Sequence, residues 1–377
     1  MEYPLCSICI ERHQKHPGAK KANSDSECFV CKGAFPKIFS LADSALAVAQ
    51  EQKFEWSNFT VRSTIKREML VREEELFDVD LADSISAKNQ LNRIVAGYVS
   101  QKSGKKFSTP AADIAFCLDF WHGTSSAVPS SLFLFARYRK LSRQYCQHIW
   151  TCQKCRGRGC KACDGKGENY PSVEGAIRSV FAPLFGASDA VLHASGREDV
   201  DVIMEGNGRP CVIELVHPRI RRTDLASAAR TLSSSHPIEL DSLRICQPYW
   251  VEAVCTSHFE KTYRAWVDAG RSVTGSELES VCNSIPLQLF QRTPMRVSQR
   301  RSDLVRKRKI LTLCVASHSG SEIVLDLKTE AGTYIKEFVH GDGGRTVPSL
   351  SSIFHSDAAC KQLNVIRIHD EFVESLS

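Results

Sequence analysis

The sequence predicts a mixed α/β (α+β) protein with more than one domain. Large apolar residues fall at every second position from Ile114 to Phe120, which is the spacing of a buried strand, whereas in 172–185 they recur at helical spacing. With 377 residues, of which 42% are hydrophobic, the chain is long enough for two or three domains with ordinary packed cores.

Charge and hydropathy set limits on the partners. A net charge of +6 permits a nucleic-acid partner without requiring one. The sequence has no basic-then-apolar leader and no uncharged apolar run of the roughly 18 residues that a membrane span needs. We therefore expect a soluble, intracellular protein in the cytoplasm and/or nucleus, with no membrane partner.

Eight of the 16 cysteines form four Cys-x-x-Cys pairs, and the first two pairs predict a metal site. Cys6, Cys9, Cys28 and Cys31 follow the pattern Cys-x2-Cys-x18-Cys-x2-Cys, in which each pair can grip one ion from a tight turn. Four thiolates in this arrangement are typical of structural Zn²⁺. We expect residues 1–34 to form a zinc module; the alternative is a leader with four reduced thiols.

Residues 35–150 alternate between helical and strand-like patterns and predict an α/β accessory domain. The expected helices lie at 41–49 and 85–99, and the expected strands at 54–61, 114–120 and 132–135. At its end, Arg137 to Arg143 sets four cations around Tyr138. This composition suits RNA phosphate contacts with base stacking, but it equally fits a solvated basic strand edge.

A second cysteine-rich segment fills 151–170. Cys152, Cys155, Cys160 and Cys163 lie in a repeat of Cys-x2-Cys-x-Gly-x-Gly, which resembles half of the zinc region of DnaJ-type chaperones. The glycines permit tight reversals, so four thiolates within twelve residues can bind one zinc ion. The competing interpretation is a loop of reduced or redox-active cysteines.

The stretch Ser195 to Val202 places acids where a loop enters a strand. Gly196 allows a sharp turn, and alternation begins at Val200, so that Asp199 and Asp201 share one face. The Asn-Gly pair in 206–210 predicts a tight hairpin with a return strand at 211–216. Asp199 would then lie at the root of a hairpin; the alternative is an exposed acidic turn without a catalytic role.

Two later segments carry further candidate residues. Val324 to Lys328 alternates as a strand, Gly332 breaks it, and Thr333 is a plausible cap for a short helix whose first turn holds Lys336. Between Gln291 and Lys309 eight cations, among them Arg292, Arg300 and Arg301, accompany a single acid. We expect this run to bind RNA phosphate rather than to be only a solvated face.

Three of these segments closely resemble the active-site motifs of RNA pseudouridine synthases. They are GREDVDV from Gly196, KTYRAWV from Lys261 and GTYIK from Gly332. The strings SVEGAI, GNGRP, QRTPMRV and KEFVHGDGGRT add to the likeness. Over roughly the last 200 residues, one large domain's worth, the chain resembles the tRNA pseudouridine synthase family of archaea and eukaryotes that has an N-terminal THUMP-containing region, the "Pus-ten" family.

The resemblance implies a fold and a set of site residues. Residues 171–377 would form the catalytic domain, with a central, mainly antiparallel sheet flanked by helices, and 35–150 a THUMP-like accessory domain that binds tRNA. Asp199 would be the nucleophile and Lys336 the base that pairs with it. The substrate site would include the stacking residue Tyr263, the pocket-closing Tyr334, the apolar wall Leu350, and Arg197.

The implied reaction converts uridine to pseudouridine in the T-arm loop of tRNA, at position 54 and/or 55. It breaks the bond from ribose C1′ to N1 of uracil and rejoins the base through C5, so it needs no catalytic cofactor, and zinc would be structural. Asp199 could attack C1′ or assist glycal formation; both routes stay open. We expect a monomer. Ile203 and Gly343 depart from the family pattern close to the pocket, which puts target choice and rate in doubt.

Two other functions remain possible at this point. Asp199, Asp201 and Glu214 could gather a divalent cation in a metal-dependent nuclease. Such sites usually have a lysine two residues after the last acid, where this chain has Val216. A zinc-containing RNA-binding protein without catalysis would be favoured if the side chains of Asp199 and Lys336 did not converge.

Overall fold

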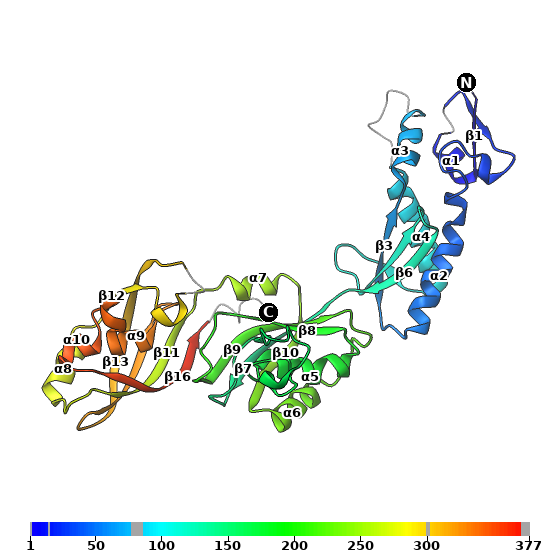
Figure 1. Ribbon diagram of the computed structural model, residues 1–377. Helices are drawn as coiled ribbons and strands as arrows, with labels where there is room; N and C mark the ends of the chain where they lie inside the picture. Colours follow the sequence, from blue (N-terminus) through cyan, green and yellow to red (C-terminus); the bar gives the residue numbers. More distant parts are fainter. Residues whose placement is uncertain (1, 14–15, 77–85, 299–301, 371–377) are drawn as a thin grey trace. The chain divides into compact units, whose positions relative to one another are not determined.

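The computed structural model describes residues 2–13, 16–76, 86–298 and 302–370 (Figure 1). The chain folds into two compact units. The first comprises Met1–Leu132 with Phe185–Ser188 and Val216–Thr223, and the second comprises Phe133–Leu184, Asp189–Leu215 and Asp224–Ser377. Both contain helices packed on sheets, which confirms the predicted mixed α/β class. None of the helices in the described part of the chain has both the length and the apolar composition of a membrane span.

The first unit is built on a four-stranded sheet with the order β4-β3-β5-β6. Helices α2 and α4 pack on this sheet, α2 against β5 and β6 and α4 against β3. The elements are β1 (Tyr3–Leu5), α1 (Ser7–Arg12), β2 (Ala19–Lys21), α2 (Ile38–Glu51), β3 (Asn58–Thr64), α3 (Arg67–Glu74), α4 (Ala87–Ser103), β4 (Lys106–Phe107), β5 (Ile114–Asp119) and β6 (Thr124–Pro129).

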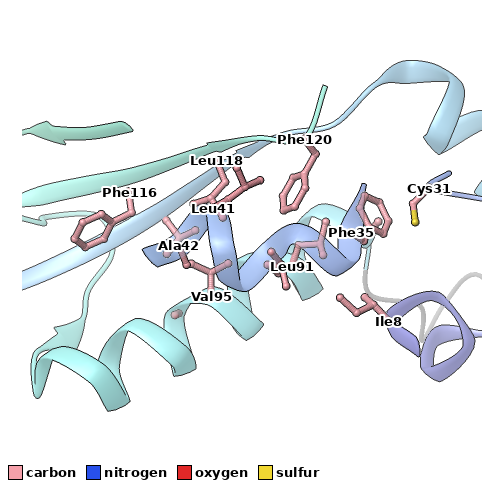
Figure 2. Packing of buried hydrophobic residues seen from close by; sticks show 14 of the residues in the cluster. Ile8, Cys31, Phe35, Leu41, Ala42, Leu91, Val95, Phe116, Leu118 and Phe120 are labelled. Carbon is pink, nitrogen blue, oxygen red and sulfur yellow. The ribbon is translucent and has the colours of Figure 1, made fainter. Parts of the chain in front are cut away.

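The N-terminal cysteine module and the α/β domain share one hydrophobic core. Figure 2 shows Ile8 and Cys31 of the module beside Phe35 and Leu91, which belong to the segments that follow. A buried ion pair between Arg12 and Glu73 of α3 also joins the two segments. The predicted boundary at residue 34 therefore does not separate two independent cores.

The second unit is organised around a ten-stranded sheet with the order β10-β7-β9-β16-β11-β14-β13-β12-β15, and β8 also pairs with β9. Most pairs are antiparallel, whereas β9 and β16 run parallel. Its strands are β7 (Leu132–Lys140), β8 (Asp189–Ala194), β9 (Val202–Val216), β10 (Ile238–Cys246), β11 (Glu260–Asp268), β12 (Leu287–Arg292), β13 (Val305–Ser319), β14 (Glu322–Thr329), β15 (Thr346–Val347) and β16 (Ala359–His369).

The α-helices of this unit are α5 (Val173–Phe185), α6 (Leu225–Ser235), α7 (Trp250–Cys255), α8 (Gly275–Asn283), α9 (Ile335–His340) and α10 (Leu350–Phe354). Strand β7 belongs to the large sheet because it pairs with β9 and β10. The division between the units accordingly falls after Leu132, whereas the sequence placed the end of the accessory domain at residue 150.

The predicted hairpin at 206–210 is wrong, because β9 runs without interruption from Val202 to Val216. Gly206 and Gly208 have positive φ values of 62° and 71°, but they form irregularities within the strand rather than a turn. A Cβ atom on Gly206 would lie 1.8 Å from the carbonyl oxygen of Ile366 in β16. The side chain of Asn207 accepts from the amide of Ile368 and donates to its carbonyl, so it takes the place of a main-chain pair.

Candidate active site

The carboxylate of Asp199 meets two cations from distant segments. Asp199 lies in the loop between β8 and β9, as the sequence predicted. Its Oδ1 accepts from Nη1 of Arg296 at 2.8 Å, and its Oδ2 lies 3.4 Å from Nζ of Lys336. The side chain of Asp199 remains 38% exposed, so the ion pairs leave it accessible. A zinc-containing RNA-binding protein without catalysis was favoured only if Asp199 and Lys336 did not converge. They do converge, so this alternative loses its support.

Lys336 lies closer to Asp201 than to Asp199. Its Nζ donates to the two carboxylate oxygens of Asp201 at 2.6 and 2.7 Å. Partial burial opposes ionisation of Asp201, but the hydrogen bond and charge of Lys336 and the charge of Arg296 together outweigh it and lower the pKa of Asp201. One ammonium group therefore serves both acids of the loop.

Helix α9 is anchored differently from the prediction. Tyr334, not Thr333, is its N-cap residue, and the hydroxyl of Thr333 instead donates to the carbonyl of Glu330. The buried amide of Gln291 both donates to the carbonyl of Tyr334 and accepts from its N–H, each at 2.9 Å. This pair of bonds fixes the main chain next to Lys336 to strand β12. Ile335, Phe338 and Val339 are buried on the inner side of this helix.

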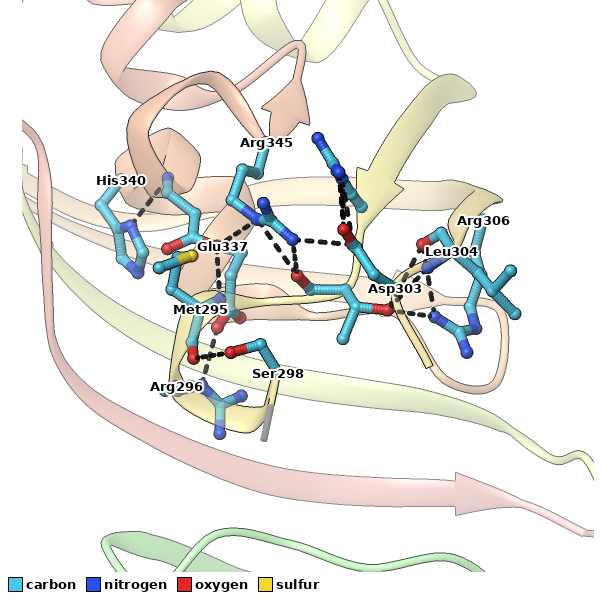
Figure 3. A network of polar contacts seen from close by, with 12 residues as sticks. Met295, Arg296, Ser298, Asp303, Leu304, Arg306, Glu337, His340 and Arg345 are labelled. Atoms are coloured by element: carbon cyan, nitrogen blue, oxygen red, sulfur yellow. Dashed lines mark hydrogen bonds and ion pairs between the residues drawn. The ribbon is translucent and has the colours of Figure 1, made fainter. Parts of the chain in front are cut away.

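Arg296 is a site residue that sequence reasoning did not single out. Its Nε donates to Oε1 of Glu337 at 2.7 Å while Nη1 contacts Asp199, and Figure 3 shows it reaching Glu337 from the Met295 turn. The Glu337 side chain is only 1% exposed. Burial disfavours the charged guanidinium, but the bonds with Glu337 and Asp199 outweigh this effect and raise the pKa of Arg296. The string QRTPMRV was the available signal, although it did not distinguish Arg296 from the other cations of the run.

The rest of the basic run has other contacts. Arg292 forms a two-pronged ion pair with Asp303. Arg345 binds the same carboxylate at 2.8 Å, and both Arg345 and Asp303 are labelled in Figure 3. Arg292 thus holds together the segment that carries Arg296, and its side chain is 53% exposed. Arg300 and Arg301 lie outside the described residues, so their predicted role in RNA binding stays a prediction.

Tyr263 lies on β11 and is half-buried. Burial raises the pKa of Tyr263 to about 12, and the nearby carboxylates of Glu198 and Asp199 act in the same direction. The phenol of Tyr263 is therefore neutral. Leu350 is fully buried at the start of α10. The guanidinium of Arg197 lies over the ring of Trp150, 5.2 Å from its centroid.

Glu198 is buried at the base of the loop. Its carboxylate accepts from the hydroxyl of Tyr138 at 3.0 Å and pairs with Arg209 at 2.8 Å. Both members of this ion pair are 1% exposed. Glu198 therefore anchors the loop through the interior of the sheet.

The same contacts overturn both interpretations of the segment Arg137 to Arg143. Tyr138 and Lys140 are fully buried and hold the loop from within, so neither is free for RNA or solvent. On the opposite face of β7, Arg139 is paired with Glu239 and Asp241 of β10. Residues alternate between the two faces of strand β7, so Tyr138 and Lys140 both point into the interior. The segment is therefore a structural support of the catalytic loop.

The acids proposed for a nuclease do not form a metal site. Glu214 bonds His193 at 3.0 Å, whereas Asp199 and Asp201 share Lys336. Within the part of the chain that the structure describes, the groups with the spacing of a metal site are the two cysteine clusters. The nuclease interpretation thus loses the geometry on which it depended.

The first cysteine cluster has the geometry of a closed four-thiolate site. The Sγ atoms of Cys6, Cys9, Cys28 and Cys31 all lie within 4.8 Å of one another, and all four residues are buried. The Cys6 and Cys31 sulfurs are 3.6 Å apart. Four sulfurs bound at about 2.3 Å around a tetrahedral zinc ion lie about 3.8 Å apart, so the cluster fits this metal.

The second cluster fits equally well. The sulfurs of Cys152 and Cys160, and those of Cys155 and Cys163, are 3.9 and 3.8 Å apart. Two of its glycines explain the tight packing of the turns. A Cβ atom on Gly159 would lie 2.5 Å from the carbonyl oxygen of Gly165, and one on Gly167 would lie 2.4 Å from that of Gly157. Only glycine allows the two turns to approach so closely.

Known proteins resemble this chain over most of its length. It is 36% identical over 354 residues to the tRNA pseudouridine synthase Pus10 of Methanothrix thermoacetophila, covering 91% of this chain and 77% of the relative. It is 35% identical over 343 residues to tRNA pseudouridine synthase Pus10 of Archaeoglobus fulgidus, covering 91% and 95%.

Half of this chain matches 43% of a chain in the crystal structure of a Cbf5-Nop10-Gar1 complex, at 17% sequence identity. The TM-score is 0.33, and this likeness is too slight to help assign the chain to a family. The family model described as "Pus10, C-terminal" matches residues 133–369, which span nearly all of the second unit and every residue of the Asp199 site. The chain therefore belongs to the Pus10 family.

Proposed function

We propose that this protein is a tRNA pseudouridine synthase that isomerises uridine 54 and/or 55 in the T-arm loop, with Asp199 as the nucleophile. The observation that carries the proposal is the meeting of Asp199, Arg296 and Lys336, which come from three separate segments of the sheet unit. The family assignment and the substrate of the named relatives support it.

In this mechanism Arg296 and Lys336 hold the carboxylate of Asp199 and direct it toward the sugar. The carboxylate either attacks C1′ or assists glycal formation. Cleavage of the bond between C1′ and N1 releases the uracil, which turns and is rejoined to C1′ through C5. C5 loses its proton and N1 gains one, so the reaction needs no net oxidant or reductant. Tyr263 would stack on the flipped base, with Tyr334 and Leu350 completing the pocket. Arg197 would contact the RNA beside it.

We assign structural Zn²⁺ to both cysteine clusters. The sulfur spacings and the burial of the ligands fit the ion, which would crosslink the chain at each cluster without contact with the base. The reaction itself requires no catalytic cofactor.

We further propose that the accessory part of the chain holds the body of the tRNA. This role is assigned to the zinc module and the THUMP-like α/β domain of the first unit, whereas β7 from Phe133 onward and the knuckle at 151–170 belong with the catalytic sheet. Arg292, Arg300 and Arg301 are assigned to phosphate binding. A monomer in the cytoplasm and/or nucleus remains the predicted state.

The test is the replacement Asp199→Ala, assayed by mapping pseudouridine on tRNA incubated with the purified protein. We expect tRNA binding to persist and product to disappear. Asp189→Ala is the matched control, because it removes a carboxylate on β8 that pairs with Arg178. Turnover at the control rate in Asp199→Ala would exclude Asp199 as the nucleophile. Cleaved tRNA on a denaturing gel would instead support the nuclease hypothesis.

A further inference from the structure

Four side chains hold the main chain of the catalytic loop. Between Ser195 and Asp201, five carbonyl oxygens accept hydrogen bonds from four side chains, here called the carbonyl clamp. The clamp consists of Arg209 bound to Ser195 (2.7 Å), Gln147 to Gly196 (2.9 Å), Lys140 to Asp199 (3.3 Å) and Val200 (2.8 Å), and Arg143 to Asp201 (2.7 Å).

Lys140 occupies the centre of the clamp. It is fully buried, and its Nζ also donates to the carbonyls of Tyr145 at 2.8 Å and Ser142 at 3.3 Å. An ammonium group has three N–H donors and no acceptor, so four surrounding carbonyls suit it as they would suit a small cation. Without such partners a buried charge would be strongly unfavourable.

Asp199 is held in two places, at its carboxylate and at its main-chain carbonyl. The carboxylate is held from the open side by Arg296 and Lys336, whereas its own carbonyl is held from the buried side by Lys140. The direction in which a side chain leaves the main chain depends on the orientation of the flanking peptide groups. Lys140 fixes the peptides after Asp199 and Val200, so it acts on that direction without touching the substrate.

We propose that Lys140 is a positioning residue for the pseudouridine synthase reaction: by binding the carbonyls of Asp199 and Val200, it sets the orientation of the catalytic carboxylate. This inference rests on the proposed function, because it needs Asp199 as the reacting group. Reacting groups must be placed to within a fraction of an ångström, and a displacement of about 1 Å can cost about 100-fold in rate.

The surroundings keep the lysine charged at neutral pH. Burial lowers the pKa of Lys140 to about 8, while the carboxylates of Glu198 and Asp201 oppose this change and Arg143 adds to it. With its pKa still above neutrality, the side chain remains an ammonium group with all three donors available.

The test compares Lys140→Met with Arg139→Met in single-turnover assays on tRNA, together with tRNA binding and thermal melting. Arg139 is the neighbouring cation on β7, it pairs with Glu239 and Asp241, and it makes no contact with the loop among the described residues. We expect Lys140→Met to lower the single-turnover rate by about 100-fold with less than about threefold change in Kd. Arg139→Met should keep the wild-type rate. A wild-type rate in folded Lys140→Met would overturn the proposal.

A second variant covers the case in which Lys140→Met does not fold. Lys140→Arg keeps the charge, but a planar guanidinium cannot reproduce the cage of four carbonyls, so we expect a folded protein at least about tenfold slower at unchanged Kd. Failure of both variants to fold would assign the lysine to the stability of the sheet and overturn the positioning role. Asp199→Ala separates the two hypotheses: if it is active, the proposed function fails, and if it is inactive while Lys140→Met is fully active, only this inference fails.

Discussion

The two cysteine clusters have the same ligands and nearly the same sulfur geometry, but their surroundings differ. Cys6, Cys9, Cys28 and Cys31 lie within the hydrophobic core of the first unit, among residues from α2, α4 and the four-stranded sheet (Figure 2). The second cluster packs on itself, since its apolar core consists of Cys152, Cys155 and Cys163 with Cys160 against them.

The difference shows that four cysteines can stabilise either a whole folded unit or a single short loop. Eighteen residues separate the two pairs of the first cluster, and only four separate those of the second. An ion in the first cluster fixes a long segment that also contributes to a shared core, so its binding energy becomes folding energy for the whole unit. An ion in the second cluster closes a short loop in the glycine-rich knuckle.

The largest expected effect comes from Cys9→Ser. Loss of this buried ligand should remove one of two zinc ions and destabilise the first unit by more than about 5 kcal/mol, enough to unfold it. Metal analysis should give one zinc per chain, and limited proteolysis should digest 1–132 while the second unit survives. Cys117→Ser, on β5 of the same unit, is the control and should stay folded with two zinc ions. A resistant first unit in Cys9→Ser would show that the clusters are equivalent.

Glu73→Gln should have the next largest effect. This buried carboxylate pairs with Arg12 and lies 3.5 Å from Nε2 of His13, so it links α3 to the cysteine module. Removing its charge breaks a buried ion pair, and we expect a loss of about 3 kcal/mol in the urea unfolding of the first unit. The exposed neighbour Glu74→Gln should change it by less than about 0.5 kcal/mol. Equal effects would mean that the module does not depend on this link.

Gly167→Ala tests the knuckle alone. The new Cβ would lie 2.4 Å from the Gly157 carbonyl oxygen, so the second cluster should lose its zinc while the melting of the first unit stays unchanged. Gly165→Ala is matched for backbone, since φ is 76° there and 74° at Gly167, but no atom lies within 4 Å of its added Cβ. It should cost about 1 kcal/mol and retain zinc. Zinc loss in both variants would point to backbone strain rather than to the clash.

The smallest effect should be on catalysis. Trp150 precedes the second cluster and supports Arg197 of the catalytic motif, so Trp150→Ala should lower kcat/KM for tRNA by about threefold, equivalent to about 0.6 kcal/mol. Tyr170 contacts the Trp150 ring edge-on, 5.6 Å between centroids, and Tyr170→Ala should leave the rate unchanged. A loss beyond about tenfold in Trp150→Ala would give the knuckle a closer part in the reaction.

Local patterns in the sequence predicted the parts of the fold that depend on neighbouring residues. The cysteine spacing indicated both clusters, and periodicity located α2, α5 and β5 closely. The meeting of Asp199 with Lys336 was expected from family motifs, because no local pattern relates two positions so far apart in the chain.

What the sequence did not predict depends on distant partners. The Asn-Gly pair at 207–208 resembles a hairpin turn, but β16 lies alongside and pairs with the Asn207 side chain. Glu198 looks like a solvated acid until Arg209 and Tyr138 are brought to it from two other strands. Within the basic run, Arg296 is distinguished by its contacts with Glu337 and Asp199, which come from distant parts of the chain.

The position of β16 has a consequence for the order in which the enzyme is made. This strand, Ala359–His369, lies between β9, which follows the Asp199 loop, and β11, which carries Tyr263. All residues of the site are synthesised before β16. The strand that joins β9 to β11 in the sheet is therefore made last. Nascent chains that stop short of residue 359 therefore contain all of the reacting groups without a working centre.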